Sequence, residues 1–307
     1  DATTTSCILE IENIEHHSIS FININNIEDL QNIDKNNHAS ISTYDYNILD
    51  PKSKWLNYFT NVTDNEKFKN LIPLKTIGKV SRGIATGSNS YFQLNKEKIS
   101  KFKLSKEVCL PCITKAPDVK NIIFNEKSFY ELYEQNKNVF IFNGEKANSI
   151  YDTSYIEFGV RNNIDKLYLT SHRTPWYAIE SKEIAPIWIS VFSRNKLKII
   201  RNELKIRNLT AFHGLYLNNN LNEEDVNILF CYLLTPISQE ILYMNKREYG
   251  EGLNKFEPND LNNAFIIDIS KISNTDRLSI CNLYNQLINN QEKTIEQLND
   301  IFKKYIY

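Results

Sequence analysis

Residues 81–92 read Ser-Arg-Gly-Ile-Ala-Thr-Gly-Ser-Asn-Ser-Tyr-Phe and predict a turn-rich loop that leads into a strand. The whole chain of 307 residues has only 8 glycines, and Gly83 and Gly87 both fall in this loop. Glycine is used where the backbone needs an unusual φ angle or lies very close to another segment. The loop also carries a cation, hydroxyls and an amide that can contact phosphates or base edges, namely Arg82, Thr86, Ser88, Asn89 and Ser90. A tight structural turn with a solvated arginine is the alternative interpretation.

Short apolar runs separated by turns surround this loop between residues 71 and 217. Strands are expected at residues 76–80, 91–94, 108–114, 139–142, 176–179, 187–191, 199–200 and 215–217. Residues 128–138 have the pattern of a short helix. This mixture predicts a β-rich, irregular domain.

The pattern becomes helical after this region. Asn222 precedes three acidic residues and an apolar face, which is a typical helix start. Pro236 is expected to kink or restart that helix. Residues 275–307 predict one long helix, or two helices that are broken near Asn289 and Asn290.

The first 70 residues have a different character. Residues 6–11 and 18–24 predict two strands joined as a hairpin. A lone hairpin is marginal in water, so these strands need a larger sheet. The chain starts with Asp1 instead of methionine, and we expect it to be a fragment or a processed product. Residues 25–70 are polar and Asn-rich, and they are expected to form a linker that packs through the aromatic residues at 55–59.

Charge is unevenly distributed along the chain. The net charge is −1, but residues 1–70 carry −6, residues 71–210 carry +10 and residues 211–307 carry −5. A strongly basic block between two acidic blocks is typical of a protein that binds a polyanion. The alternative is a solvated, lysine-rich surface without a partner.

Composition excludes several other classes of protein. The chain is 41% hydrophobic, which excludes global disorder, and no apolar run reaches the roughly 18 residues that a membrane helix needs. The 5 cysteines include one Cys-x-x-Cys pair, Cys109 and Cys112, in an apolar run. Without a second pair or a His-x3-His partner, buried thiols in a reducing compartment are expected, and no metal site.

Three further segments of the chain combine cations with aromatic or amide side chains. Arginine beside aromatic rings suits stacking or phosphate binding, although aromatic residues also fit a core. The candidate contact residues in these segments are His172, Arg173, Trp176, Tyr177, Arg194, Asn195, Lys198, Asn202 and His213. Arginine and asparagine suit base edges, whereas lysines such as Lys101, Lys103 and Lys106 suit phosphates.

No catalytic motif is present in the sequence. It lacks a Gly-x-Gly-x-x-Gly fingerprint, a phosphate-binding Walker loop, a Gly-x-Ser-x-Gly elbow and a His-Glu-x-x-His metal motif. The five histidines and the scattered acids form no acid–base pair. The expected catalytic, cofactor-binding and metal-binding residues of this chain are therefore none.

The ordered segments resemble the C-terminal half of the γ-class, Taq-type DNA N6-adenine methyltransferases. Residues 82–92 match the family's Arg-Gly-Ile-x-Thr-Gly-x-Asn-x-x-Phe signature, and residues 173–177 match its Arg-x-Pro-Trp-Tyr element. Residues 202–216 follow as the Asn/Thr-rich segment, and residues 249–261 match the closing Tyr-Gly-x-Gly-x-x-Lys-Phe-x-Pro-x-(Asp/Glu)-Leu element, which adds Lys255 to the candidates. The Asn-rich composition is similar to that of a solitary clostridial member with an AT-rich genome.

The resemblance implies an α+β fold. A β-rich DNA target-recognition domain with C-terminal helices would follow a hairpin that belongs to an upstream α/β methyltransferase sheet. The expected divisions are the end of the catalytic domain at 1–30, a linker at 31–70, the target-recognition domain at 71–217 and its helical part at 218–307.

The resemblance also implies a function. Such enzymes transfer a methyl group from S-adenosylmethionine to adenine N6 after flipping the base out of the duplex. The family's Asn/Asp-Pro-Pro-Tyr tetrapeptide and glycine-rich cofactor motif have no match here, so they are expected upstream, and no cofactor is expected on this chain. Its expected partners are double-stranded DNA and that catalytic domain, in the same polypeptide or as a separate piece. No membrane contact is expected, and the place of action would be the cytoplasm, at the nucleoid.

Two other arrangements remain open at this point. One is a stand-alone specificity subunit of a restriction–modification system, although such subunits carry two recognition domains and only one basic block is visible here. The other is the C-terminal half of a combined restriction–methylation enzyme, whose nuclease would also lie upstream.

Overall fold

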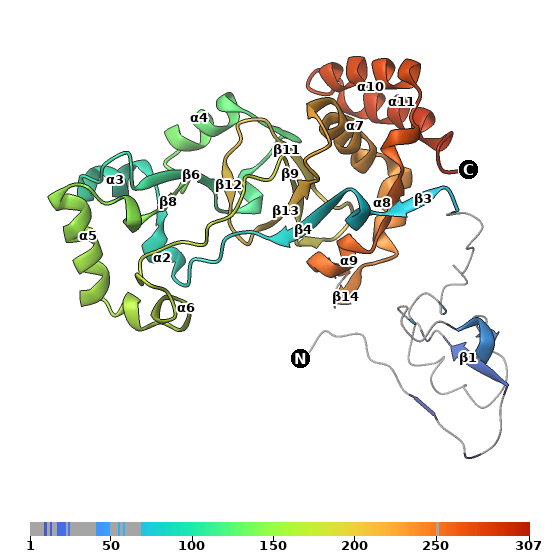
Figure 1. Cartoon of the computed structure of the whole chain (residues 1–307), viewed down its shortest axis with the longest axis horizontal. Helices are drawn as coiled ribbons and strands as arrows, with labels where there is room; N and C mark the ends of the chain where they lie inside the picture. The colour runs from blue at the N-terminus through green and yellow to red at the C-terminus, as the bar shows by residue number, and fades with distance from the viewer. Residues whose placement is uncertain are drawn as a thin grey trace.

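The computed structural model describes residues 9–10, 13, 17–22, 24, 41–49, 55, 58, 69–249 and 252–307. These residues form a mixed α/β structure with several small sheets. In Figure 1 one group of helices lies at each end of the main body, with a central sheet between them.

The central sheet has five strands in the order β4 (Gly78–Arg82), β13 (Phe212–Leu217), β9 (Ile187–Ser190), β11 (Ile199–Asn202) and β7 (Ile123–Phe124). All neighbours are antiparallel except β11 and β7. Side chains alternate between the faces of a strand, and β9 follows this rule with both faces buried. Ile187 and Ile189 pack into one core, whereas Trp188 packs into another. The sheet therefore separates two hydrophobic cores.

Helices cover the first of these faces. They are α7 (Glu223–Leu234), α8 (Pro236–Tyr243), α10 (Asn274–Gln286) and α11 (Gln291–Lys303). Asn222 caps α7 in a capping box with Asp225, and Arg277 of α10 forms ion pairs with Asp225 and, at 2.8 Å, with Glu224. The cap and the proline restart confirm the sequence prediction. Of the two alternatives for the C-terminal segment, the structure has two helices, with the break at residues 287–290.

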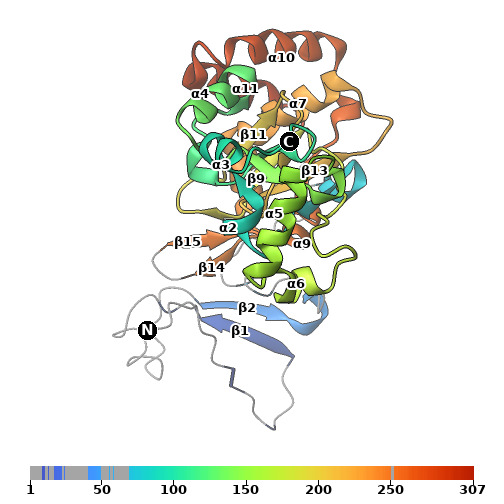
Figure 2. The ribbon, with the colours of Figure 1, turned by 90° about the vertical axis from the view of Figure 1, so that its left-hand side faces the viewer.

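A second lobe lies at the other end of the sheet, as Figure 2 shows from that side. Its four strands run in the order β12 (Arg207–Asn208), β6 (Cys109–Ile113), β8 (Phe140–Phe142) and β5 (Gln93–Leu94). Its helices are α2 (Asn89–Phe92), α3 (Lys96–Phe102), α4 (Glu126–Glu134), α5 (Ile150–Arg161) and α6 (Tyr168–Ser171). The core of this lobe is aromatic: the rings of Tyr91 and Tyr155 stack at 4.7 Å, and each hydroxyl donates to the other residue's carbonyl.

Smaller elements complete the fold. The strands β10 (Phe192–Ser193), β15 (Leu253–Lys255) and β14 (Arg247–Tyr249) form one sheet, and β16 (Phe265–Ile267) pairs with β3 (Leu71–Pro73) beside α9 (Pro258–Asn262). The short 3-10 helices are η2 (Tyr46–Ile48), η4 (Leu74–Thr76), η5 (Ala116–Asp118), η6 (Gly144–Lys146), η7 (Ile164–Lys166) and η8 (Ile269–Lys271).

Two of the predicted strands differ in the structure. Residues 91–92 end helix α2, and only 93–94 form a strand. Residues 176–179 form no strand, because Trp176 packs on the aromatic core of the lobe, 5.5 Å from the ring of Tyr91. Aromatic residues have a high strand propensity, and the tertiary contacts override it at both places.

The N-terminal pairing also differs from the prediction. Strand β1 (Ser18–Ile22) pairs with β2 (Ile41–Asp45), inside the segment that was expected to be a linker. Of the other predicted strand, residues 6–8 and 11 lie outside the described residues, and residues 9–10 are not in a strand. The ring centre of Phe21 lies 5.4 Å from that of Tyr58 and 5.9 Å from that of Trp55, so these two aromatic residues pack on a neighbour as expected, while Phe59 lies outside the described residues.

The cysteine pair lies on β6, where both side chains are buried. Burial raises the pKa of the Cys109 thiol to about 12 and raises that of Cys112 as well, as expected for structural thiols. Among the described residues, no group of three or more His, Cys, Asp or Glu is placed to hold a metal ion.

Within the described part of the chain, no single helix combines the length and the apolar character that crossing a membrane requires. The pair α7 and α8 satisfies both criteria only when taken together across a bend of 76°.

Candidate nucleic-acid interface

The loop at residues 82–92 depends on both of its glycines. Ile84 forms a parallel bridge with Leu209, and a Cβ atom at Gly83 would lie only 2.1 Å from the Leu209 carbonyl oxygen. Gly87 has a φ of +83°, which is a left-handed conformation that other residues rarely adopt. The close approach and the unusual φ were both expected from the sequence.

Arg173 anchors the same loop from a neighbouring segment. Its guanidinium donates to the carbonyl oxygens of Ala85 at 2.5 Å, Thr86 at 2.9 Å and Ala178 at 3.1 Å. The side chain is half-buried, and burial lowers its pKa. Its charge therefore faces the backbone of the loop and holds the loop in place.

Trp176 and Tyr177 pack in the same lobe. The Trp176 ring packs against Gly159, where a side chain would collide with it, and lies close to Tyr91. The Tyr177 ring packs against Gly144. Both rings are half-buried. In the structure, which holds no DNA, Trp176 and Tyr177 therefore pack in the core of the lobe, which was one of the two alternatives from the sequence.

Arg82 faces solvent at the start of the loop. Its guanidinium binds Glu180 with two hydrogen bonds, 2.6 and 3.1 Å long, and half of its side chain is exposed. Burial acts to raise the pKa of Glu180, but the hydrogen bond and charge of Arg82, together with Lys182 and the backbone of Ala85, outweigh burial and lower that pKa. A phosphate or base that binds Arg82 must compete with this carboxylate.

The turn at residues 194–198, between β10 and β11, presents polar side chains and is called the polar turn below. Arg194 and Asn195 are exposed there, and their side chains have no hydrogen-bond or ion-pair partner among the residues that the structure describes. Lys198 points inward instead: its Nζ donates to the carbonyl oxygens of Val119 and, at 3.1 Å, of Ala116. This lysine therefore ties the turn to the segment that follows β6.

Asn202 and His213 are buried inside the sheet. The Asn202 amide donates to the carbonyls of Ala185 and Ile206, both at 2.8 Å, and its oxygen accepts from the Ile206 N–H. His213 Nε2 lies 2.8 Å from the carbonyl oxygen of Phe256. Since that oxygen can only accept, Nε2 carries a proton. These two side chains connect elements of the fold and present no polar group to the surface.

A cationic and aromatic surface lies on the small sheet of β10, β15 and β14. Lys255 Nζ lies 5.8 Å from the ring centres of both Phe192 and Tyr249. It also forms an ion pair with Glu257 at 2.6 Å. The rings of Phe192 and Tyr249 are 49% and 41% exposed.

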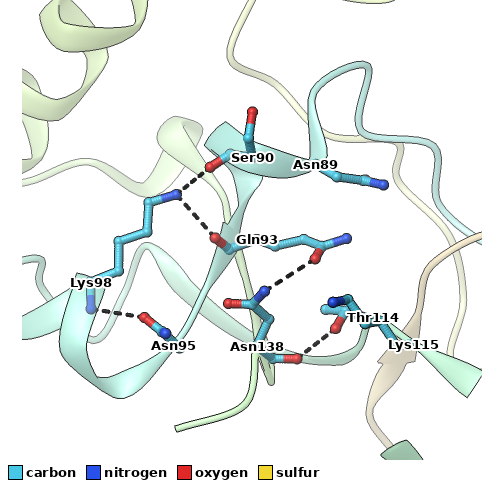
Figure 3. A pocket seen from close by; sticks show the side chains of 8 residues that line it. All are labelled: Asn89, Ser90, Gln93, Asn95, Lys98, Thr114, Lys115 and Asn138. Carbon is cyan, nitrogen blue, oxygen red and sulfur yellow. Dashed lines mark hydrogen bonds between the residues drawn. The ribbon is translucent and has the colours of Figure 1, made fainter. Parts of the chain in front are cut away.

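A polar pocket of about 380 Å³ adjoins the loop, and its position was not predicted. Figure 3 shows its eight lining residues: Asn89, Ser90, Gln93, Asn95, Lys98, Thr114, Lys115 and Asn138. Lys98 Nζ donates to the carbonyls of Ser90, Tyr91 and Gln93, and burial lowers its pKa to about 8.

The sequence could not predict this pocket, because its lining residues come from three separate segments of the chain. Gln93 was assigned to a strand for its apolar neighbours, and Asn138 lies 45 residues later at the entry to β8. The density of Asn and Gln next to the loop was the available signal, but the Asn-rich composition of the whole chain concealed it.

The structure divides the predicted residues into two groups. Those at or near the surface are Arg82, Ser88, Asn89, Ser90, His172, Arg194, Asn195 and Lys255. Those that face inward are Thr86, Arg173, Trp176, Tyr177, Lys198, Asn202 and His213. Contact with DNA stays a prediction for the first group. The second group has structural partners within the protein.

Comparisons with known proteins place this chain in a family. Residues 52–306 match the family model described as Type II methyltransferase M.Eco57I, C-terminal domain. The Type II methyltransferase M.AccI of Acinetobacter calcoaceticus is 41% identical over 294 residues, which cover 93% of this chain and 54% of that protein. The Type II methyltransferase M.XamI of Xanthomonas campestris pv. amaranthicola is 24% identical over 193 residues, which cover 62% of this chain and 35% of that protein.

The solved structure of the type IIG restriction endonuclease BpuSI aligns with 77% of this chain and 31% of its own, with 12% identity and a TM-score of 0.48. The chain thus spans about half, or less, of the length of the methyltransferases that it matches. Because the family match extends over residues 52–306, this chain belongs to the family of the M.Eco57I-type C-terminal domain of Type II methyltransferases.

Proposed function

We propose that this chain recognises a specific sequence in double-stranded DNA for a methyltransferase that modifies adenine at N6. The observation that carries the proposal is the basic segment, residues 71–210, whose side chains sum to a net charge of +10. Exposed side chains there include Arg194 and Asn195, whose side-chain types pair with guanine and adenine edges. Membership of a Type II methyltransferase family supports the same function.

The methyl transfer itself belongs, in this proposal, to a catalytic domain outside this chain. The γ-class tetrapeptide Asn/Asp-Pro-Pro-Tyr does not occur in the sequence. S-adenosylmethionine would bind to that domain, which would share the polypeptide or join as a separate piece. The chain described here would hold the duplex and select the sequence, and the transfer would follow base flipping.

The test is the salt dependence of duplex binding. A basic surface that neutralises about five phosphates should give a slope near −4 to −5 when log K is plotted against log salt concentration. Fluorescence anisotropy with a labelled duplex measures this slope over a range of salt. A slope near zero would remove the electrostatic basis of the proposal.

A further inference from the structure

The pocket beside the loop at residues 82–92 contains polar side-chain atoms that form no hydrogen bond with the described residues. Asn138 Nδ2 donates to Gln93 Oε1 at 3.4 Å, and Asn89 Oδ1 accepts from Thr86 at 2.7 Å. Among the described residues, no partner is found for Gln93 Nε2, Asn89 Nδ2 or Asn138 Oδ1. Asn89 is exposed, and Gln93 Nε2 and Asn138 Oδ1 are not among the fully buried, unpaired atoms, so both atoms keep some contact with solvent.

The side chains are held in position by the fold. Gln93 begins strand β5, and 93% of its surface is buried. Lys98 fixes the turn around it through the carbonyls of Ser90 and Gln93, as the dashed lines in Figure 3 show. In the same view the side chains of Asn89 and Gln93 extend in the same direction. A fixed amide loses little conformational entropy when it binds.

The charge of the lining limits the class of ligand. Of the eight described residues around the pocket, two are lysines and none is a carboxylate. Lys115 is exposed at the rim, where it can contact a phosphate. Lys198 holds the segment just after Lys115, so the exposed turn with Arg194 and Asn195 is tied to the same side of the lobe. This lining suits a ligand that offers an uncharged hydrogen-bonding edge to the amides and a neighbouring phosphate to the lysine at the rim.

We propose that this pocket is a base-reading site and that Gln93 contacts the N6/N7 edge of one adenine in the bound duplex. The inference rests on the proposed function. Glutamine matches adenine because its Nε2–H donates to N7 while its Oε1 accepts from the N6 amino group. Gln93 has the donor free and one remaining lone pair on Oε1. Asn89 and Asn138 supply a further donor and acceptor for the neighbouring base or for bridging water.

The experiment uses the full-length methyltransferase and the sequence that it methylates, which is mapped by sequencing of modified bases. Each adenine of that duplex is replaced in turn by 7-deaza-2′-deoxyadenosine, which lacks the N7 acceptor. At one of these positions, the replacement should lower the affinity of the wild-type protein for the duplex about tenfold or more. Gln93→Ala should bind the unmodified duplex about tenfold more weakly and become insensitive to the replacement at that one position.

Two further variants keep the result interpretable. Gln93→Met retains the volume of the side chain without its amide, and it replaces Gln93→Ala if that protein does not fold. Gln135→Ala removes an exposed glutamine at the end of α4, outside the pocket, and should keep the wild-type pattern at every adenine. Free 2′-deoxyadenosine 5′-monophosphate should not displace the duplex, because a single nucleotide offers one phosphate and the duplex offers several.

The outcomes separate this inference from the function on which it rests. If the wild type discriminates sequences but the Gln93 variants keep its sensitivity at every adenine, the base-reading assignment is wrong. Equal losses on specific and random duplexes would show that Gln93 has a structural role only. Displacement of the duplex by the free nucleotide would assign the pocket to a nucleotide effector. If the wild type itself prefers no sequence, the proposed function fails as well.

Discussion

Arg173 is expected to contribute to stability more than to DNA affinity, because its guanidinium donates to three backbone carbonyls around the loop. In Arg173→Ala these half-buried acceptors lose their charged donor. Removing one partner of such hydrogen bonds costs roughly 1–3 kcal/mol. The free energy of unfolding, from denaturant titration, should fall by about this amount.

The matched control for this variant is Arg161→Ala. Arg161 is exposed on α5, and its Nη1 lies 3.7 Å from Glu157, which is a surface pair of small value. Its removal should leave the free energy of unfolding within a few tenths of a kcal/mol. Equal stability of both variants and the wild type would contradict the anchoring role of Arg173.

His213 should make the protein sensitive to acid. Burial lowers its pKa below the usual value of 6.5, so the unfolded chain takes up a proton at a higher pH than the folded protein does. Stability contributed by neutral His213 is therefore present above about pH 6.5 and is lost as the pH falls from there toward the folded pKa. Free energies of unfolding between pH 5 and pH 7.5 should show this loss.

The comparison variant is His213→Gln, whose amide can still donate to the Phe256 carbonyl but does not titrate in this range. The difference in stability between wild type and variant should shrink as the pH falls below about 6.5. Parallel pH profiles of the two proteins would show that this histidine does not titrate as its burial requires.

At the scale of elements, α11 is expected to support the sheet without touching DNA. Lys303 and Lys304 on and after this helix form ion pairs with Asp300 and Asp276, both at 3.1 Å. The double reversal Lys303→Glu, Lys304→Glu should leave duplex affinity within a few tenths of a kcal/mol, as for other surface changes. A tenfold loss in an anisotropy assay would show that the helix contacts the duplex.

A corresponding double charge reversal in the basic segment is expected to weaken DNA binding. Lys115 and Lys196 are both exposed, at the pocket rim and in the polar turn. The variant Lys115→Glu, Lys196→Glu should bind duplex more weakly and flatten the salt slope by about two. Equal behaviour of the two double variants would remove the distinction between the basic segment and the helices.

The elements show how far the sequence could predict this fold. The cap at Asn222 and the restart at Pro236 depend on neighbours in the chain, and both were predictable. The strand expected at residues 176–179 was wrong, because Trp176 packs against Tyr91, a residue far away in the chain. The partner of β1 was also wrong, since pairing with residues 41–45 spans an intervening loop that no local pattern defines.

The candidate site shows the same limit at the level of side chains. The sequence located the loop and the polar turn because glycines and exposed cations have local signatures. It could not separate Asn195, which is exposed, from Asn202, which is fully buried and binds two carbonyls. Both are asparagines in a basic segment, and the position of Asn202 in the sheet, where β11 pairs with β7, decides which one faces inward.

For the whole molecule, the structure arranges the candidate contact segments around the central sheet. The loop continues from β4, the polar turn joins β10 to β11, and His213 on β13 binds the segment after β15. Asn262 of α9 also binds the backbone N–H and carbonyl of Val80 on β4. The C-terminal helices therefore hold in register the strands from which the candidate contacts project.

The central claim is that this chain selects a DNA sequence, and selection from a randomised duplex library tests it most directly. The protein is incubated with the library at moderate salt, and the retained duplexes are sequenced. One short motif should be enriched, and under the proposed function it should coincide with the sequence that the full-length methyltransferase modifies. Recovery of all sequences in equal proportion, or of a motif different from the methylated one, would contradict the account.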